Sequence, residues 1–361
     1  MSSIIGYRLN RQQGLTLVEL LIAMLIAIIA MLAISQVLVV NSSYQRSTVG
    51  TSDAQTTGAL ALHTLETDGR MAGFGLASSS LLGCGQIRYQ FNGTSPTPVL
   101  TVAPVEIIAG TGNGPDTITF MMASHAERVI PASTRLAMSG ADADLDMFDV
   151  LGFNTGDIFL ISDSTNLSSG THGCTLMQVS AVNLTTSRIE HDTSSDFPYN
   201  PSGGFTGIMY PKDSLVFNLG QPSVKRYAIA SNSLQVTSYF STDAATSKPL
   251  FDPTARVLYE QIVNMQAEYG KDNNDDGIVD TYNKTPPVTS TDWIQVLTIR
   301  LGLLVRSKDQ EKPVNGVCEA TTALPTWTGG TFSIPGGVPS CFKYRVYETI
   351  IPMRNMIWRE S

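Results

Sequence analysis

An uncharged, apolar stretch near the amino terminus constrains this chain more than any other feature. No charged residue occurs between Glu19 and Arg46, and that interval is longer than the roughly 20 residues that cross a bilayer. A carboxylate in the middle of a membrane costs about 2.5–3.5 kcal/mol, and less near the interface, where Glu19 would lie. Because an acidic residue in such a segment usually serves a function, the sequence predicts a membrane-spanning helix in which Glu19 has a role.

Two arginines precede the apolar stretch. Arg8 and Arg11 lie before it, and after Glu19 the next charge is Arg46. The positive-inside rule therefore predicts a cytoplasmic amino terminus and a translocated remainder. A conventional secretory signal is excluded, because no small-x-small cleavage site follows a short apolar core. We expect a single-pass inner-membrane protein with a periplasmic carboxy-terminal domain.

The start of the apolar stretch resembles that of type IV prepilins, in which a glycine and an apolar residue precede Thr-Leu-(Ile/Val)-Glu. Here Gly14 and Leu15 are followed by residues 16–19, Thr-Leu-Val-Glu, with Leu15 in place of the usual phenylalanine. The resemblance implies cleavage after Gly14 by a prepilin peptidase and methylation of the new amine on Leu15. It also implies that Glu19 pairs with the terminal amine of a neighbouring subunit in a filament. An uncleaved signal anchor with an incidental glutamate is the alternative.

The net charge argues against a nucleic-acid-binding protein, and the cysteines predict disulfides rather than a zinc site. The formal net charge is −8, whereas a nucleic-acid partner requires a basic surface. Four cysteines in a translocated chain predict two disulfides, because the periplasm oxidises thiols. Three pairings are possible; we favour Cys84–Cys174 with Cys318–Cys341, because the second pair brackets one Pro- and Gly-rich loop. Buried thiols are the alternative, and zinc is not expected without C-x-x-C spacing.

The distribution of prolines and turn residues predicts an α+β fold, and the resemblance to type IV prepilins implies that it is a pilin fold. No proline occurs between Leu15 and Met71, so a long helix is expected, weakened by about 1 kcal/mol at each of Gly50 and Gly58. Major pilins usually carry a proline early in this helix, so its absence suggests a minor component. The predicted units are a leader (1–14), a helix (15–75, with 15–40 in the membrane) and a β-rich domain with long loops (76–361).

Patterns of β-branched and alternating residues predict the strands. A hairpin is expected around Ser231-Asn232, a strand or a helix followed by a strand at residues 253–269, a half-buried strand at 293–306, and a last strand within 342–358. The remaining expected strands cover residues 86–91, 99–108, 117–122, 157–162, 175–182, 214–218, 223–230 and 233–239.

Three short segments resemble the PilW group of type IV pilus minor pilins, which is related to the J-type pseudopilins of type II secretion. They are residues 70–74, 304–307 and 354–355. The resemblance implies a structural protein that primes pilus assembly and lies at the filament tip, first in the inner membrane and then outside the cell. Its implied partners are other minor pilins, the major pilin and a PilY-type adhesin. The alternatives are a J-like pseudopilin or a membrane-anchored periplasmic binding protein or hydrolase.

An acidic loop at residues 272–280 predicts weak calcium binding. Its spacing is that of a partial calcium-binding loop, with a glycine, Gly277, at the sharp turn. A similar acidic stretch recurs in the PilW group. Asn283 replaces the usual bidentate glutamate at the last position, so the expected affinity is in the range of about 10⁻⁴–10⁻³ M, and a solvated turn without an ion is the alternative. The candidate ligands are Asp272, Asn274, Asp276, Asp280 and the carbonyl of Ile278.

Enzyme signatures are poor. The chain has no Gly-x-Ser-x-Gly, His-Glu-x-x-His or P-loop motif, and no organic cofactor is expected. His172 and His191 are predicted to be surface-loop residues rather than catalytic groups. We therefore do not expect an enzyme.

Overall fold

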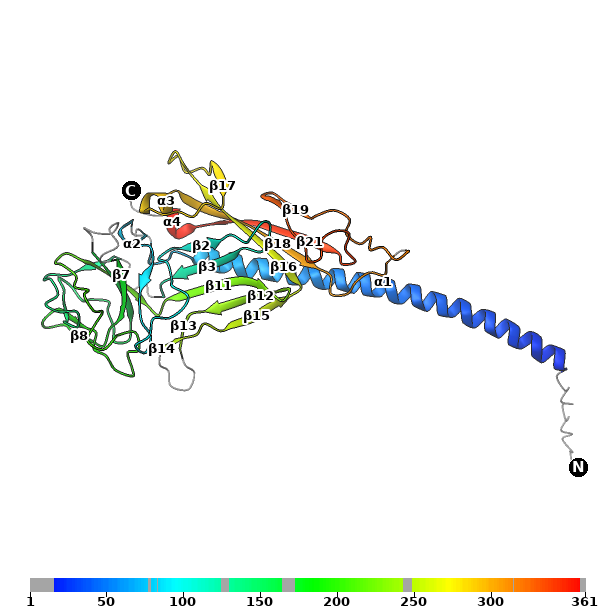
Figure 1. Ribbon diagram of the computed structural model, residues 1–361, viewed down its shortest axis with the longest axis horizontal. Helices are drawn as coiled ribbons and strands as arrows, with labels where there is room; N and C mark the ends of the chain where they lie inside the picture. The colour runs from blue at the N-terminus through cyan, green and yellow to red at the C-terminus, as the bar shows by residue number, and fades with distance from the viewer. Residues whose placement is uncertain are drawn as a thin grey trace, which may run out of the picture.

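In the computed structural model, one long helix projects from a β-rich body (Figure 1). The structure describes residues 16–76, 79–82, 84–124, 130–163, 173–242, 249–313 and 315–357. The predicted leader and the first residue of the predicted helix lie outside these ranges. This arrangement confirms the expected α+β class: an apolar amino-terminal helix followed by a strand-rich globular domain.

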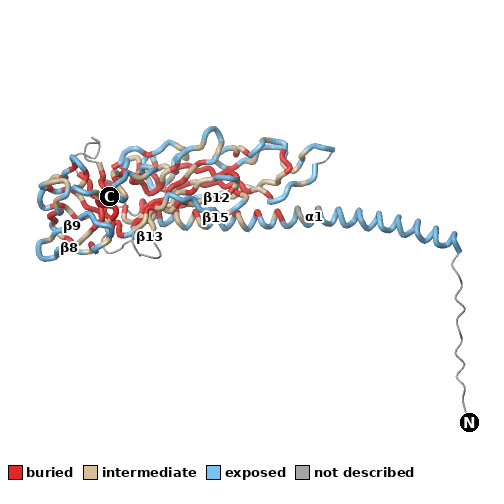
Figure 2. The backbone as a smooth tube through the Cα atoms, turned by 60° about the horizontal axis from the view of Figure 1, so that its bottom comes forward, coloured by how far each residue is buried: buried red, intermediate tan, exposed pale blue. Residues whose placement is uncertain are grey.

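The helix α1 spans Leu17–Met71, 55 residues, which corresponds to about 80 Å at 1.5 Å per residue. Its amino-terminal half is exposed, whereas buried residues begin at Gly50 and continue into the body (Figure 2). At its end the N–H of Ala72 reaches the carbonyls of Asp68 and Gly69. Gly73 then adopts a φ of +80°, a conformation that glycine accepts without a Cβ penalty.

Two antiparallel sheets and the second half of α1 enclose the main core. Its members come from α1 (Ala61, Leu65), from the first sheet (Phe120) and from the second sheet (Leu301, Ile351). The helix has an apolar stripe on this side because its small and aliphatic residues recur at helical spacing. The first sheet has the order β15 (Ala255–Glu260), β12 (Ser233–Ser238), β11 (Ser223–Ala230), β3 (Thr117–Met122), β2 (Val105–Ile108), and the second β17 (Thr281–Asn283), β16 (Ile262–Lys271), β18 (Val296–Arg306), β21 (Tyr344–Pro352). Two short helices, α3 (Ser290–Ile294) and α4 (Arg354–Ile357), flank the second sheet's strands in the chain.

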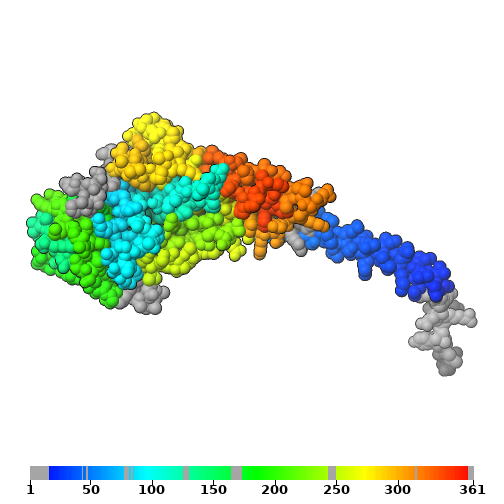
Figure 3. Space-filling model, viewed as in Figure 1, coloured from blue at the N-terminus to red at the C-terminus, as the bar shows by residue number. Residues whose placement is uncertain are grey.

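A distal lobe lies at the end of the body farthest from the start of α1 (Figures 1 and 3). Short strands build it around two further apolar clusters. Its larger sheet has the order β1 (Ile87–Arg88), β7 (Cys174–Gln178), β6 (Ile158–Ser162), β10 (Leu215–Gly220), β4 (Ala132–Ser133), and its smaller one β5 (Leu145–Asp146), β9 (Arg188–Glu190), β8 (Ala181–Asn183). The remaining elements are α2 (Ser79–Leu82) and the paired strands β13 (Phe240–Thr242) with β14 (Pro249–Phe251) and β19 (Thr326–Trp327) with β20 (Gly330–Thr331).

The expected hairpin is confirmed: β11 and β12 pair from Ala230 and Ser233 outward. The turn residues Ser231 and Asn232 both have positive φ, 50° and 57°, as a two-residue hairpin turn of the primed type requires. Residues 253–269 form strands with no helical part, ending in β16.

The strand expected to be half-buried at 293–306 differs from that prediction. Its first residues form α3, and β18 is buried on both faces over much of its length. Leu304 lies on the face of β18 opposite Leu303 and Val305, the face that a half-buried strand leaves to solvent, but it packs with Trp327, Phe332 and Ile334. These last three residues come from the loop between Cys318 and Cys341. The alternation of residues within β18 could not show that this loop covers the second face of the strand.

Candidate functional site

The beginning of α1 is defined by Thr16, the first described residue. Its Oγ1 accepts a hydrogen bond from the N–H of Glu19 at 3.3 Å, and its carbonyl accepts one from Leu20 at 3.1 Å. Threonine is favoured at this position because its hydroxyl satisfies an N–H that lacks a partner within the helix. The predicted processing residues, Gly14 and Leu15, lie outside the described residues.

Glu19 occupies the first turn of α1 with an exposed side chain. Its carboxylate makes no hydrogen bond or ion pair with any residue that the structure describes. The partial positive charge at a helix amino terminus favours an acid here. In an apolar environment, however, the carboxylate still requires a cationic or hydrogen-bonding partner. The geometry leaves Glu19 open to a group from another molecule.

The first half of α1 is long and apolar enough to cross a membrane. The candidate span is Leu17–Ser42, with 26 residues and a mean hydropathy of 3.0, and none of its most apolar window is buried within the molecule. A helix that is apolar on all sides is normally surrounded by lipid or protein. This surface therefore has to be covered by something outside the chain.

The second half of α1 is fastened to the first of the two central sheets by polar contacts. Asp68 accepts hydrogen bonds from Lys225 Nζ at 2.9 and 3.0 Å and another from the Tyr227 hydroxyl. Thr64 Oγ1 lies 2.9 Å from the Tyr259 hydroxyl. Burial, together with the hydrogen bond and charge of Asp68, raises the pKa of Tyr227, so its hydroxyl remains a donor. These contacts fix the exposed half of α1 relative to the body.

Two further residues at this junction have roles that the sequence did not reveal. Gly58, expected merely to weaken the helix, lies directly against the ring of Tyr347. Asn355, which the sequence marked by resemblance alone, donates from Nδ2 to the carbonyls of Met71 and Ala72 at 3.1 and 3.0 Å. It thereby adds a hydrogen bond to two carbonyls that have no partner within the helix, of which that of Met71 also accepts from the N–H of Phe74 at 3.3 Å.

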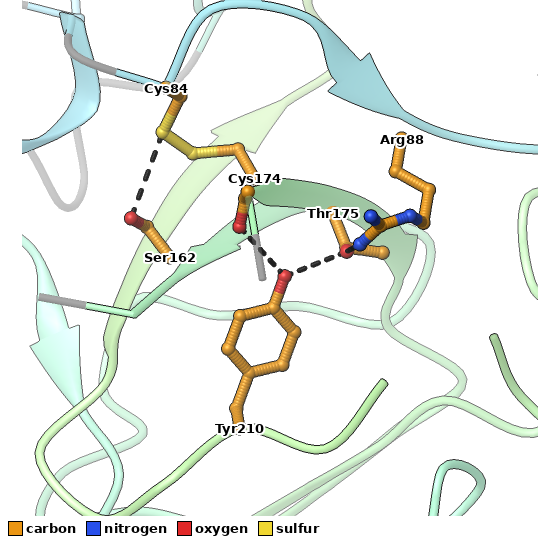
Figure 4. Close-up of a disulfide and its surroundings, with 7 residues drawn as sticks. Cys84, Arg88, Ser162, Cys174, Thr175 and Tyr210 are labelled. Atoms are coloured by element: carbon orange, nitrogen blue, oxygen red, sulfur yellow. Dashed lines mark hydrogen bonds between the residues drawn. A yellow bond between two sulfur atoms is a disulfide. The ribbon is translucent and has the colours of Figure 1, made fainter. Parts of the chain in front are cut away.

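Both expected disulfides are present, Cys84–Cys174 and Cys318–Cys341. The first joins the segment after α1 to β7 of the distal lobe (Figure 4). Beside it, the Tyr210 hydroxyl is hydrogen-bonded to Thr175 Oγ1 at 2.7 Å. Burial raises the pKa of Tyr210 to about 12, so this hydroxyl keeps its proton. The disulfide thus links the segment that follows α1 covalently to the larger sheet of the distal lobe.

The acidic loop connects β16 to β17 and is organised around Asp272. The Asp272 side chain, buried at 3 % exposure, accepts backbone N–H bonds from Gly277 at 2.7 Å, Asn274 at 3.2 Å and Asp276 at 3.3 Å. Burial opposes ionisation of this carboxyl, but the hydrogen bonds outweigh it, so its pKa lies below the ordinary value. Gly277 has a φ of +83°, as the predicted sharp turn needs.

The other candidate ligands are also held by the backbone. Asp276 Oδ1 accepts from the N–H of Ile278 at 2.8 Å, and Asp280 Oδ2 accepts from Asn273 at 2.8 Å. Carboxylate and amide oxygens are the donors that calcium prefers. Among the residues that the structure describes, however, no three acidic, histidine or cysteine side chains are placed to hold a metal ion. The donor type suits calcium, and calcium binding stays a prediction.

The histidines do not form a catalytic group among the described residues. His191, expected on the surface, is buried at 7 % exposure, and its Nε2 lies 2.9 Å from the Ala143 carbonyl. It is a structural residue of the distal lobe. His172 lies outside the described residues.

In the comparison with known proteins, two separate parts of the chain match family models. Residues 226–355 match the family model described as type IV pilus-assembly protein W, and residues 9–35 match the prokaryotic N-terminal methylation motif. No curated protein sequence matches the chain. Among solved structures, a type IV-like pilin from Thermus thermophilus is similar at 12 % identity and a TM-score of 0.34, over 85 % of this chain and 98 % of that one.

The methylation motif, the exposed apolar helix and the β-rich body are features of type IV pilins, a class of structural rather than enzymatic proteins. The match to residues 226–355, which include most of the strands that pack on α1, supports a type IV pilus minor pilin of the PilW type. The distal lobe lies outside both matches.

Proposed function

We propose that a prepilin peptidase cuts this chain after Gly14 and methylates Leu15, and that Glu19 then pairs with the terminal amine of a neighbouring subunit. The observation that carries this proposal is the exposed Glu19 in the first turn of α1, whose carboxylate has no partner among the described residues. In a lone subunit this carboxylate stays unpaired in or near the hydrocarbon, at a cost of up to about 2.5–3.5 kcal/mol. Pairing in the filament removes that cost and sets the register between helices.

In the same proposal, the subunit waits in the inner membrane with its amino terminus in the cytoplasm and its body in the periplasm. The basic residues before the span support this orientation. After extraction, the helix surface of residues 17–42 packs against the helices of other minor pilins and of the major pilin.

We place the subunit at the filament tip, where it primes assembly. The PilW match supports this position, and so does the distal lobe at the opposite end of the molecule from the start of α1 (Figure 1). The lobe carries exposed apolar side chains, among them Phe148, Leu151 and Leu184. By analogy with the PilW group, a PilY-type adhesin is the proposed partner.

Mass spectrometry of the mature amino terminus, combined with Glu19→Ala, tests this function. We expect cleavage after Gly14 in both proteins, but loss of the variant from sheared filaments. Asp53→Ala, which changes an exposed acid farther along the same helix, is the matched control and should assemble. An intact Met1, or normal assembly of Glu19→Ala, would refute the proposal.

A role in type II secretion is the second candidate. The PilW match favours the pilus. Deletion of the gene decides between them: the pilus function requires loss of twitching, and a pseudopilin function requires loss of exoprotein release.

A further inference from the structure

A groove of about 650 Å³ lies where α1 leaves the globular body. One wall is formed by Val39, Ser42 and Tyr44 of α1, and the other by Ser307, residues 309–313 and Lys343. Figure 3 shows these segments meeting: the orange part of the body, which follows β18, borders the blue helix where it emerges. The groove is therefore the part of the body nearest to the membrane-spanning segment.

The length of α1 places this groove at the level of the lipid headgroups. About 20 helical residues cross the hydrocarbon core, so a span that begins at Leu17 leaves the core near Val37. The headgroup layer on each side is about 5–7 Å thick, or some four helical residues. Val39 therefore lies within that layer, Ser42 at its outer edge and Tyr44 about one helical half-turn beyond it. Tyr44, 69 % exposed, is also a residue type enriched at membrane interfaces.

The charged lining of the groove contains both signs in equal number. Lys312 and Lys343 are matched by Asp309 and Glu311, and Lys343 forms an ion pair with Glu311. The N–H of Glu311 donates to the Cys341 carbonyl at 2.7 Å, so the Cys318–Cys341 disulfide helps to hold this wall. A phospholipid headgroup with a phosphate and a primary ammonium group presents the complementary pair of charges.

We propose that this groove binds the headgroup of an aminophospholipid in the periplasmic leaflet of the inner membrane, while the subunit is in that membrane. Lys312 donates to the phosphate and Asp309 accepts from the ammonium group, while the Lys343–Glu311 ion pair forms part of the wall beside them. This contact would orient the body on the bilayer before the subunit is extracted. It depends on membrane insertion and is independent of filament assembly.

The test is a titration of the full chain in detergent with dihexanoyl-phosphatidylethanolamine, followed by native mass spectrometry. We expect tighter binding of this lipid than of dihexanoyl-phosphatidylcholine, whose ammonium group cannot donate a hydrogen bond. Lys312→Gln should weaken binding about five-fold, the effect of one lysine at a phosphate surface. Asp309→Asn should reduce the preference for ethanolamine over choline.

Two control variants test whether the lipid binds specifically in the groove. Lys212→Gln removes an exposed lysine of the distal lobe and should bind like the unaltered chain, as should Glu19→Ala even if it fails to assemble. Equal affinity for the two lipids, or for Lys312→Gln and the unaltered chain, would overturn the proposal. Equal competition by inorganic phosphate would identify a simple anion site, and also overturns it. A loss of assembly in Lys312→Gln without a change in lipid binding would assign the groove to a neighbouring subunit instead.

Discussion

Gly58 of α1 lies so close to Tyr347 of β21 that a Cβ at residue 58 would come within 2.4 Å of Cε2 in the tyrosine ring. The helix and the second sheet therefore approach each other at a point where only a glycine fits. This close approach positions α1 on β21, and with it the direction in which the membrane span leaves the body.

Gly58→Ala should lower the free energy of unfolding of the globular body by about 1–3 kcal/mol, because overpacking outweighs the gain in helix propensity. Gly50→Ala is the matched control. Its added Cβ would meet Ser307 at an ordinary 3.7 Å, so propensity should raise stability by up to about 1 kcal/mol. Denaturant unfolding of the full chain in detergent measures both changes, and a stabilised Gly58→Ala would contradict the geometry.

The contacts of Asp68 should be worth more than its position near the end of a helix suggests. Asp68→Ala leaves the buried hydroxyl of Tyr227 and the ammonium of Lys225 without their acceptor, at an expected cost of about 2–3 kcal/mol. Tyr227→Phe should cost about 1 kcal/mol, and the double variant should show non-additivity. Asp53→Ala should change stability by less than about 0.5 kcal/mol. Denaturant unfolding measures these changes, and additive effects of the two substitutions would mean that the contact contributes nothing.

The distal lobe should lose stability in acid through Asp146. The hydrogen bond from Arg135 lowers the pKa of this carboxyl below its ordinary value, against the effect of burial. Because the folded-state pKa lies below the unfolded one, the contribution is complete above the unfolded pKa of about 4 and disappears as pH falls through the folded pKa. The stability difference between the unaltered chain and Asp146→Asn should therefore be constant from about pH 7 to 5 and shrink below about pH 4. Arg135→Gln should remove most of that dependence, and a difference that persists unchanged at about pH 2 would contradict it.

Calcium should stabilise the chain only at millimolar concentration. For a site with the expected dissociation constant, calcium at about ten times that constant adds about 1.4 kcal/mol. Asp272→Asn with Asp276→Asn removes the charge, so the calcium-dependent shift in melting temperature should vanish. Each asparagine has one acceptor oxygen, so at Asp272 the N–H bonds to Oδ1 and the bond from Gly277 to Oδ2 cannot all be kept. Asp213→Asn, in an exposed turn, should retain the shift. If EDTA and calcium give the same melting temperature in the unaltered chain, the loop is a plain turn.

The two disulfides should differ in their effect on stability. The residues that they join are 90 and 23 positions apart, so loop entropy predicts about 4.6 kcal/mol for Cys84–Cys174 and about 3.4 kcal/mol for Cys318–Cys341. Paired Cys→Ala variants, compared by denaturant unfolding, measure the difference. A larger loss of unfolding free energy on removing Cys318–Cys341 would show that this disulfide stabilises the fold by more than the loop entropy that it removes from the unfolded chain.

Local features of this chain were predictable. An uninterrupted run of apolar residues without proline indicates α1, since hydrogen bonds within a helix need no distant partner. Ser231 and Asn232 are turn residues between two segments with strand patterns, so the hairpin of β11 and β12 could also be predicted. The disulfide pairs followed from the number of cysteines, an oxidising compartment and one local loop.

Contacts between distant segments were not predictable. The burial of Leu304 depends on Trp327 and Phe332, which carry no regular pattern, and the burial of His191 is accompanied by a contact with the carbonyl of Ala143. The role of Gly58 depends on the ring of Tyr347, far away in the chain, which no helical periodicity can indicate.

The sequence alone determined that this chain has an apolar helix long enough to cross a membrane, with one acidic residue at its start, and a β-rich domain with two disulfides. Charge, hydropathy and turn chemistry act over a few residues. The tertiary structure decided how the second half of α1 packs between the sheets. It also leaves the Glu19 carboxylate without a partner among the described residues. It also decided that the wall held by Cys318–Cys341 borders the membrane span. These relationships come from packing among segments far apart in the chain, and packing is decided by shape and burial in the folded state.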